Sequence, residues 1–426
     1  MGIVVSSLGI LASPEGWVAT PARPRSELQV VTGTGLYLTP TAAVAQSRDN
    51  SQWATLHCRP GAQGTLRWWQ RQGLLVSIPL VSIIITNFNY ARYLPQSIDS
   101  ALSQTHPKTE VVVVDDASVD NSRDIIREYG SRIIAVLRER NGGQGAAFNA
   151  GFTAIGGDIV VFLDADDYLY PGAVARVVSA WTPGISKVQY RLDLVDGAGR
   201  KLDLFPAPEV RFDSGDVVPR MLATGRYETA VTSGNAFARG ALEKILPVPE
   251  AEFRMGAEGY LVTLAPFYGP VVSLDEPLGV YRQHGANAWR LDGSAPGEHL
   301  RRSLEHDSHK YRALRVKARE MGKEVPQALG MRDHHHLSTR LASLCLDPAL
   351  HPYANDYRSA LALRGAVASW HARLPWKRRA ILATWFIAIG FLPRRLAAPV
   401  IVWRLAPAFR PPAVDRFLKT LRLLVR

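Results

Sequence analysis

The sequence Asp158-Ile-Val-Val-Phe-Leu-Asp164-Ala-Asp166-Asp167 carries five consecutive apolar residues directly before three carboxylates. Five apolar positions in a row are typical of a β-strand that is buried on both faces. The carboxylates would follow where this strand ends, and ligands bind at the carboxyl ends of strands in an open α/β sheet. The stretch therefore predicts an α/β fold with a chemical site at the end of one of its central strands.

Strand and helix patterns alternate on the N-terminal side of this stretch, as a series of βαβ units requires. The strands predicted there are 81–86, 110–114 and 132–137. A helical pattern follows each of them, with Asp120 as the expected N-cap of the second helix. Further along, the turn Asp196-Gly197 predicts a hairpin. The expected fold is a mostly parallel sheet flanked by helices, with a helical extension at the C-terminal side.

Asp164 and Asp166 stand two apart at a strand end, where both side chains can converge on one cation. Mg²⁺ or Mn²⁺ held by one or two carboxylates and by substrate phosphates is the usual arrangement for such a pair. Taken alone the pattern is weak, because capping or solvated acids produce it too. Asp115 and Asp116 at the preceding strand end support it, since carboxylates there can accept hydrogen bonds from a base or a ribose.

The glycine-rich segment Asn141-Gly142-Gly143-Gln144-Gly145 opens a helix after the third predicted strand. A dinucleotide-binding fold would place its glycines after the first strand, where Asn87-Phe88-Asn89-Tyr90 stands instead. The sequence therefore argues against a dinucleotide site. A tight turn that merely caps a helix is the alternative interpretation of the glycines.

Four motifs, in this order and spacing, resemble family 2 glycosyltransferases of the GT-A fold over roughly residues 79–290. They are Val81-Ser-Ile-Ile-Ile-Thr-Asn-Phe-Asn-Tyr90, Val113-Val-Asp-Asp-Ala-Ser118, Arg140-Asn-Gly-Gly-x-Gly-Ala-Ala-x-Asn149-x-Gly151 and Phe162-Leu-Asp-Ala-Asp-Asp167. The resemblance implies an inverting transferase that takes a sugar from a nucleotide-diphosphate donor.

The same resemblance implies roles for individual residues. Thr86, Asn87 and Asn89 would line the nucleotide pocket, and Asp115 and Asp116 would contact the base and ribose. The glycine-rich segment would lie beside the donor, which makes Asn141, Gly142 and Gly145 further candidates. Asp164 and Asp166 would hold Mg²⁺ or Mn²⁺ on the diphosphate.

An acceptor hydroxyl needs a general base, which the family places at a helix start, usually as the Asp of a Glu-Asp pair. This chain reads Gly256-Ala-Glu258-Gly259-Tyr260 and so departs from that pattern. If Tyr260 anchors the alignment, Gly259 stands at the Asp position and the base is lost. Shifted by one residue, Glu258 takes the role, and it is the predicted base. The alternative is a carboxylate that only stabilises a helix N-terminus.

The segment Tyr281-Arg282-Gln283-His284 resembles the family's late Tyr-Arg-x-His motif. It implies that His284 completes the metal or diphosphate site and that Arg282 pairs with phosphate. A lone histidine is otherwise more often structural.

Positive charge is concentrated at the C-terminal end. From Trp370 to Arg426 the chain carries 12 Lys and Arg against one acid, Asp415, which accounts for nearly all of its net charge of +12. A nucleic-acid-binding body would carry basic residues over its own surface, so no nucleic-acid partner is expected. The apolar runs at 380–392 and 396–403 are shorter than the roughly 18 to 20 residues that span a bilayer. They predict a tail that lies on an anionic membrane surface, or else one folded back onto the body or into an oligomer contact.

Four regions are expected along the 426 residues. They are a poorly structured extension at 1–77, which lacks the charged start of a signal peptide; a glycosyltransferase domain at 78–290; a helical extension at 291–370; and a basic amphipathic tail at 371–426. The two cysteines, Cys58 and Cys345, have no metal-site or disulfide spacing and suit a reducing compartment.

These patterns together predict a metal-dependent, inverting glycosyltransferase on the cytoplasmic face of the cell membrane. It would build a surface polysaccharide or glycolipid on a glycan or lipid-linked acceptor. Two other classes stay open: a non-catalytic protein that binds nucleotide sugars, and a nucleotidyltransferase on a similar sheet. The second would need a glycine-rich loop with Lys or Arg after the first strand, which the chain does not have.

Overall fold

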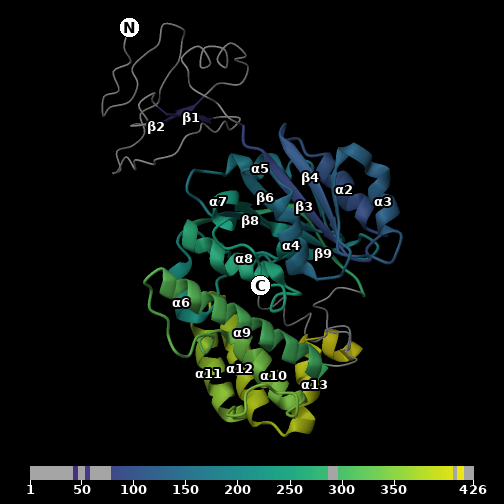
Figure 1. Cartoon of the computed structure of the whole chain (residues 1–426). Helices are drawn as coiled ribbons and strands as arrows, with labels where there is room; N and C mark the ends of the chain where they lie inside the picture. Colours follow the sequence, from purple (N-terminus) through teal and green to yellow (C-terminus); the bar gives the residue numbers. More distant parts are fainter. Residues whose placement is uncertain (1–41, 47–52, 58–77, 286–295, 406–409, 417–426) are drawn as a thin grey trace.

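A computed structural model describes residues 42–46, 53–57, 78–285, 296–405 and 410–416 of the chain. Figure 1 shows an α/β part built around one large sheet and, below it, a group of C-terminal helices. Within the predicted N-terminal extension, β1 (Ala42–Gln46) pairs antiparallel with β2 (Trp53–His57). The rest of the extension predicted at 1–77 lies outside the described residues.

The large sheet has nine strands in the order β5-β4-β3-β6-β10-β8-β11-β7, with β9 paired to β8. Its strands are β3 (Val81–Asn87), β4 (Thr109–Asp115), β5 (Ile134–Leu137), β6 (Ile159–Asp164), β7 (Tyr168–Leu169), β8 (Lys187–Asp196), β9 (Lys201–Phe205), β10 (Asn235–Ala238) and β11 (Val271–Gln283). β5, β4, β3 and β6 are parallel neighbours, and β8 and β11 run in the same direction, whereas β10, β7 and β9 run against them. The mostly parallel sheet is confirmed.

Helices cover both faces of the sheet. They are α2 (Leu94–Leu102), α3 (Ser122–Tyr129), α4 (Gln144–Thr153), α5 (Ala173–Ser179), α6 (Val218–Thr224), α7 (Arg239–Leu242) and α8 (Ala257–Leu264). Val161 and Leu163 of β6 belong to the buried cluster under α2, α3 and α5. Val160 and Phe162 point the other way, and Phe162 stacks on Phe148 of α4 with ring centroids 4.2 Å apart. The prediction that this strand is buried on both faces is therefore confirmed.

Local predictions agree with the structure in most places and differ in two. The hairpin around Asp196 is present as β8 and β9. The strand expected at 132–137 begins only at Ile134, because Gly130 ends α3 with a positive φ of 53° and a short 3₁₀ turn follows. Asp120 is not the N-cap; Asn121 holds that position, and Asp120 instead accepts bonds from Ser122 N at 3.0 Å and Ala91 N at 2.9 Å. Asp120 thus ties the start of α3 to the loop after β3.

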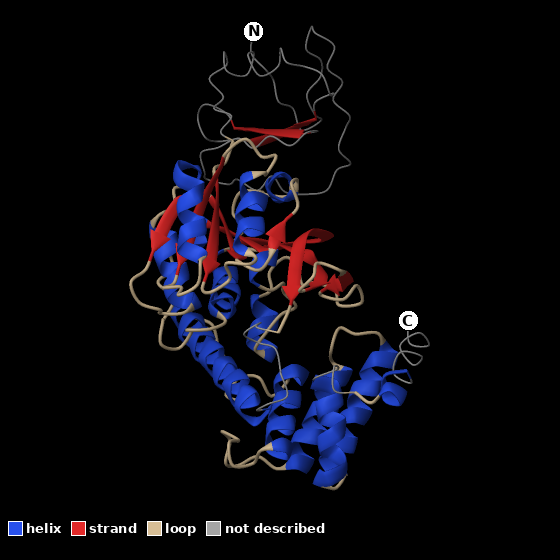
Figure 2. Ribbon diagram, turned by 90° about the vertical axis from the view of Figure 1, so that its right-hand side faces the viewer, coloured by secondary structure: helices blue, strands red, loops and turns tan. Residues whose placement is uncertain are grey.

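The C-terminal helices form their own buried core. They are α9 (Pro296–Glu320), α10 (His334–Leu346), α11 (Arg358–Trp370), α12 (Trp376–Phe391) and α13 (Arg394–Leu405). Phe386 and Ile389 of α12 are fully buried with Leu337 of α10 and Leu361 of α11. The long helix α9 packs on both α8 and α10 and so joins this group to the sheet part (Figures 1 and 2).

The expected tail at 371–426 thus contributes α12 and α13 to a packed helical group. Both helices still expose large apolar side chains, among them Trp376 and Phe391 of α12 and Leu396 of α13. Within the described ranges, none of the helices is long and apolar enough to cross a membrane. Membrane binding by this region stays a prediction.

Candidate active site

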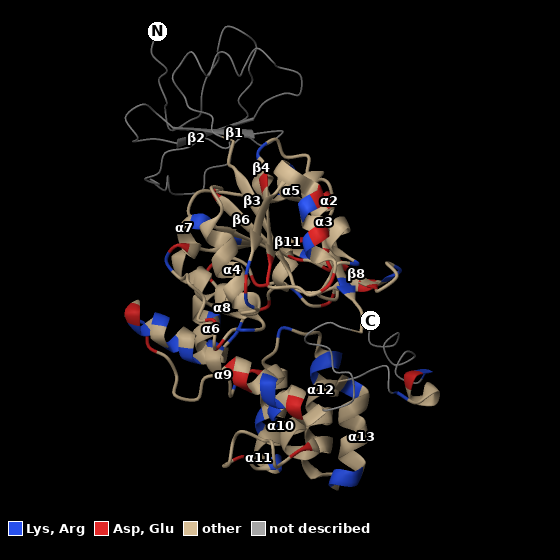
Figure 3. Ribbon diagram, turned by 45° about the vertical axis from the view of Figure 1, so that its right-hand side comes forward, with Lys and Arg blue, Asp and Glu red and all other residues tan. Residues whose placement is uncertain are grey.

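The predicted acids lie in a tight turn at the end of β6. Acidic segments gather at the end of the central strands that faces the C-terminal helices (Figure 3). Asp167 is buried and anchors the turn, since one carboxylate oxygen accepts from Arg282 N at 2.9 Å and the other from Ser233 Oγ at 2.6 Å. Asp166 Oδ2 lies 2.9 Å from His284 Nε2. Asp164 keeps a partly exposed side chain. The turn thus presents Asp164 and Asp166 as the pair available to a ligand.

Like charges make this turn electrostatically costly. Burial first, and then the charges of Asp166 and Glu258, raise the pKa of Asp164 to about 8. Burial and the charges of Asp166 and Asp164 raise the pKa of Asp167 well above its usual range. A bound divalent cation would offset this repulsion, so the donor set fits one. Among the described residues no group of three His, Cys, Asp or Glu side chains is already arranged as a metal site. A cation held by the turn would therefore draw further ligands from a donor diphosphate or water.

Asp115 and its neighbours form a closed hydrogen-bond network at the end of β4. Asp115 is fully buried and accepts from Asn87 Nδ2 at 2.9 Å, Ser118 N at 3.0 Å and Arg123 Nε at 2.8 Å. Burial acts to raise its pKa, but these hydrogen bonds outweigh burial and lower it. Asn89 Oδ1 accepts from the backbone N–H of residue 119 at 2.8 Å. Asp115 is therefore an ionised carboxylate, and its hydrogen bonds hold the loops around the expected nucleobase pocket in place.

Asp116 holds the glycine-rich loop. Its two carboxylate oxygens accept from Gly142 N at 3.0 Å and Gly143 N at 2.6 Å, and Arg138 pairs with the same group. Asn141 Nδ2 donates back to the carbonyl of Asp116 at 3.1 Å. The loop predicted to lie beside the donor is thus fixed to the end of β4 by the acid predicted to contact the donor.

Close packing explains why the loop is rich in glycine. Gly143 has a φ of 81°, and a Cβ on it would lie 2.2 Å from the carbonyl oxygen of Arg254. A Cβ on Gly145 would lie 2.7 Å from the carbonyl oxygen of Phe253. Gly145 therefore faces the segment before α8, and its place beside the donor stays a prediction.

Gln144, which the sequence did not single out, connects the two halves of the site. Its Nε2 donates to Asp164 Oδ1 at 3.1 Å, and its Oε1 accepts from Ala257 N at 2.9 Å. One side chain therefore links the acidic turn to the first residue of α8, which lies next to Glu258. Its position between two glycines of the motif is the only sequence signal that could have pointed to it.

Glu258 stands in the first turn of α8, as predicted, with a partly exposed side chain. Burial raises its pKa, while the charge of Lys310 on α9 acts in the opposite direction. The next residue, Gly259, has no room for a side chain, because its Cβ would lie 2.6 Å from His306 Nε2 and 3.0 Å from Lys310 Cδ. Side chains of α9 thus occupy the space beside Gly259, which would be the Asp position if Tyr260 anchors the alignment, and Glu258 is the carboxylate that α8 brings close to Asp164.

Arg282 and His284 approach the acidic turn from the end of β11. Arg282 Nε donates to the carbonyl of Asp166 at 2.9 Å, and its Nη2 donates to Gln96 Oε1 at 2.7 Å. Its guanidinium also lies 4.9 Å from the ring centroid of Tyr93. These contacts already engage the Arg282 guanidinium. Its predicted pairing with a phosphate would require it to give up some of them.

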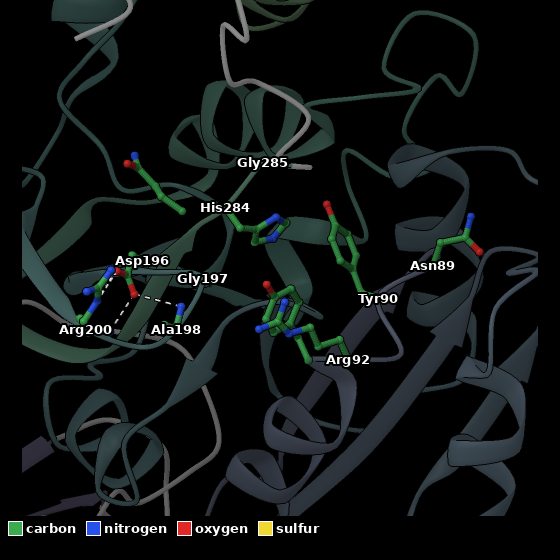
Figure 4. A pocket seen from close by; sticks show the side chains of 11 residues that line it. Asn89, Tyr90, Arg92, Asp196, Gly197, Ala198, Arg200, His284 and Gly285 are labelled. Carbon is green, nitrogen blue, oxygen red and sulfur yellow. Dashed lines mark hydrogen bonds and ion pairs between the residues drawn. The ribbon is translucent and has the colours of Figure 1, made fainter. Parts of the chain in front are cut away.

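His284 stacks on Tyr93 with ring centroids 4.9 Å apart and meets Tyr90 edge-on at 5.5 Å. Figure 4 shows His284 and Tyr90 beside one another among the residues that line a cavity of about 650 Å³. The loop after β3, which carries Asn89, and the tip of the β8–β9 hairpin complete its walls. The cavity adjoins the acidic turn through the contact between His284 and Asp166.

The predicted site residues therefore converge on one edge of the sheet through a continuous set of contacts. Those with a contact described above, or a place at these strand ends, are Thr86, Asn87, Asn89, Asp115, Asp116, Asn141, Gly142, Asp164, Asp166, Glu258, Arg282 and His284. The contributions of Gln144, His306 and Lys310 were not predicted.

Comparison with known proteins identifies the family. Residues 82–201 match the model for glycosyl transferase family 2. An uncharacterized glycosyltransferase of Nostoc sp. is 40% identical over 223 residues, which cover 51% of this chain and 69% of the Nostoc protein. The undecaprenyl-phosphate 4-deoxy-4-formamido-L-arabinose transferase of Edwardsiella ictaluri is 32% identical over 210 residues, covering 43% of this chain and 64% of that enzyme. Among solved structures, S. aureus TarS aligns with a TM-score of 0.44 at 15% identity, over 78% of this chain and 55% of TarS.

The sequence matches place this chain in glycosyltransferase family 2. The protein is accordingly a glycosyltransferase, and the suspected family is confirmed. This finding contradicts the alternative of a nucleotidyltransferase.

Proposed function

We propose that the protein transfers a sugar, with inversion, from a nucleotide-diphosphate donor to an acceptor hydroxyl in the synthesis of a cell-surface polysaccharide or glycolipid. The observation that carries the proposal is the link through Gln144 between the acidic turn and the helix that bears Glu258. It joins a group suited to the leaving diphosphate to a group suited to the attacking hydroxyl.

Asp164 and Asp166, with His284 beside Asp166, are the residues that would hold Mg²⁺ or Mn²⁺. When bound, the cation supplies positive charge that stabilises the departing diphosphate. Asp167, Ser233 and Arg282 keep the turn in place through the hydrogen bonds described above. The chain's own contribution at this end is a pair of carboxylates that these hydrogen bonds position before a donor binds.

Glu258 is the proposed general base. It accepts the proton of the acceptor hydroxyl while the hydroxyl oxygen forms a bond to the anomeric carbon. The bond from that carbon to the diphosphate oxygen breaks, and its electron pair leaves with the nucleotide diphosphate. Burial brings the pKa of Glu258 above its usual value and closer to the operating pH, where a base is most effective. Backbone hydrogen bonds and the charge of Lys310 limit this rise in the pKa.

Turnover of nucleotide sugars by the Glu258→Gln variant tests the assignment. With Mn²⁺ present, we expect donor hydrolysis or transfer to fall by about 10²- to 10⁴-fold, which is the usual contribution of a positioned base. Glu324→Gln, at an exposed position on the loop after α9, is the matched control and should retain full activity. Unchanged turnover in Glu258→Gln would remove Glu258 as the base.

Thermal shift with the same donors separates catalysis from binding. A donor at 100 times its dissociation constant stabilises the folded protein by about 2.7 kcal/mol, and Glu258→Gln should keep that shift. Binding without turnover in the wild-type protein would favour the alternative of a non-catalytic nucleotide-sugar-binding protein.

The acceptor is proposed to be a glycan or a lipid-linked sugar, and the site of action the inner face of the cell membrane. Support comes from the Edwardsiella relative, whose name includes undecaprenyl phosphate, and from the basic C-terminal helices with Trp376 and Phe391 exposed. Lys377, Arg394 and Arg395 also lie on these helices, next to or near the exposed aromatic residues. This composition suits contact with anionic headgroups.

A further inference from the structure

A second cavity, of about 770 Å³, lies where the sheet part meets the C-terminal helices. Its walls come from α6, from the segment after it that carries Arg226, from the start of α10, and from one side of α11. None of the residues assigned above to the donor, the cation or the base lines it. It is therefore a separate feature that the transfer reaction leaves unexplained.

Cations dominate the polar lining of this cavity. Arg220, Arg226, Arg332 and Arg364 face it, against two acids, Glu228 and Asp333. Arg220 Nε lies 2.9 Å from Asp213, whereas Arg226 approaches Asp333 only at 3.4 Å. Within the part of the chain that the structure describes, the buried Nε of Arg226 has no hydrogen-bond partner.

Among the described residues that line the cavity, the positive charge without a paired acid is that of the two outer arginines. Arg332 and Arg364 are exposed, and no acid within the described residues forms an ion pair with either of them. Several guanidinium groups that converge on one cavity favour an anion with several oxygen acceptors, and phosphate is the group that best matches their planar donors.

An apolar wall stands beside these cations. Leu363 and Val367 line the cavity on α11 and are 54% and 59% exposed. Trp370, 51% exposed, continues the same row, because positions i, i+4 and i+7 share one helix face. The opposite face of α11 is buried, with Leu361 and Ala362 in the helical core. α11 thus has two apolar faces, and among the described residues only the face with Leu361 and Ala362 is covered by protein.

We propose that this cavity binds an anionic lipid, with the lipid phosphate among Arg226, Arg332 and Arg364 and its apolar chain along Leu363, Val367 and Trp370. Charge complementarity selects the phosphate, and the exposed row on α11 selects a ligand with an apolar chain over inorganic phosphate. The proposal does not depend on which sugar is transferred or on the identity of the base.

Vesicle co-sedimentation of the full chain tests the site. Vesicles that contain phosphatidylglycerol in phosphatidylcholine are compared with phosphatidylcholine alone. We expect binding only to the anionic vesicles, weakened on the order of 30-fold in Arg332→Gln/Arg364→Gln, as loss of two basic residues near an anionic surface implies. Arg319→Gln/Lys323→Gln removes the same charge from exposed positions at the end of α9 and the turn that follows it, and should bind as the wild type does. Equal loss in both double variants, or no binding by the wild type, would overturn the proposal.

A second variant separates a lipid from free phosphate. Leu363→Ser/Val367→Ser alters only exposed positions and should weaken vesicle binding several-fold while the thermal shift produced by inorganic phosphate stays unchanged. Unchanged vesicle binding in this variant, together with displacement of vesicles by inorganic phosphate, would make the cavity a free-phosphate site and contradict the proposal. All these variants should keep wild-type donor turnover, so a failure here is distinct from a failure of the proposed function.

Discussion

At the residue scale, the proposed chemistry depends on how the environments of four neighbouring carboxylates shift their pKa values differently. Asp115 is held ionised by its hydrogen bonds, although burial opposes this. Asp167 is buried and Asp164 only partly exposed, and the limited access of water together with the neighbouring acids raises the pKa of both. Glu258 is also raised by burial, but Lys310 moderates the effect. Two groups whose environments push their pKa values apart are the usual basis for separate roles in one site.

Lys310 should therefore set the acidic limb of the pH profile. A base acts only when deprotonated, so the rate should fall as the pH drops through the pKa of Glu258, which lies above the usual value for glutamate. In Lys310→Met the moderating charge is gone and the pKa rises further, so the acidic limb of kcat/KM should move to higher pH. Lys310→Arg keeps the charge and should restore the wild-type profile. If the limb stays in place in Lys310→Met, another group controls it.

At the element scale, the glycine-rich loop and Gln144 connect the ends of β4 and β6 to the start of α8 through hydrogen bonds. Asp116 holds the loop from one side, and Gln144 reaches Asp164 and Ala257 on the other. The motif and its place in the sheet were predictable from apolar periodicity and glycine spacing. The Gln144 bridge was not, because Ala257 is 113 residues away and the contact exists only once α8 is packed.

Gln144→Ala tests whether this connection contributes to turnover as well as to the stability of the fold. The variant loses one hydrogen bond to a carboxylate and one to a helix N–H, which we expect to cost about 1–3 kcal/mol in the free energy of unfolding. Because Asp164 and α8 are no longer linked, turnover should fall about tenfold, as small misplacements in a site do. Gln104→Ala is the matched control: Gln104 also bridges elements through Tyr170 O and Val174 N, both at 2.9 Å, but lies elsewhere. Equal losses of turnover in both variants would reduce Gln144 to a purely structural residue.

At the scale of the whole molecule, the sheet part was more predictable from sequence than its junction with the C-terminal helices. Buried strands such as β6 produce continuous apolar runs, and the acids at their ends follow from strand direction. The helical pattern of α9 was visible too, but its partner was not, since periodicity does not show what a helix packs against. His306 and Lys310 therefore escaped notice, and Gly259 stood only as a departure from the family pattern. The structure explains that departure, because α9 occupies the space where a side chain would lie.

Placing an Asp at position 259 should therefore destabilise the contact between α8 and α9. In Gly259→Asp the new Cβ would lie 2.6 Å from His306 Nε2, and His306 has little room to move because its ring packs edge-on against Phe253 at 5.7 Å. Overpacking of this kind costs about 1–3 kcal/mol, which chemical denaturation would measure as a lower midpoint at an unchanged slope. The double variant Gly259→Asp/His306→Ala removes the obstructing ring and should recover part of the loss, beyond what the two single changes add up to. Strictly additive losses would show that α9 does not determine the residue at position 259. Recovery would instead establish that the helical extension and the site at the sheet edge constrain one another through a single glycine.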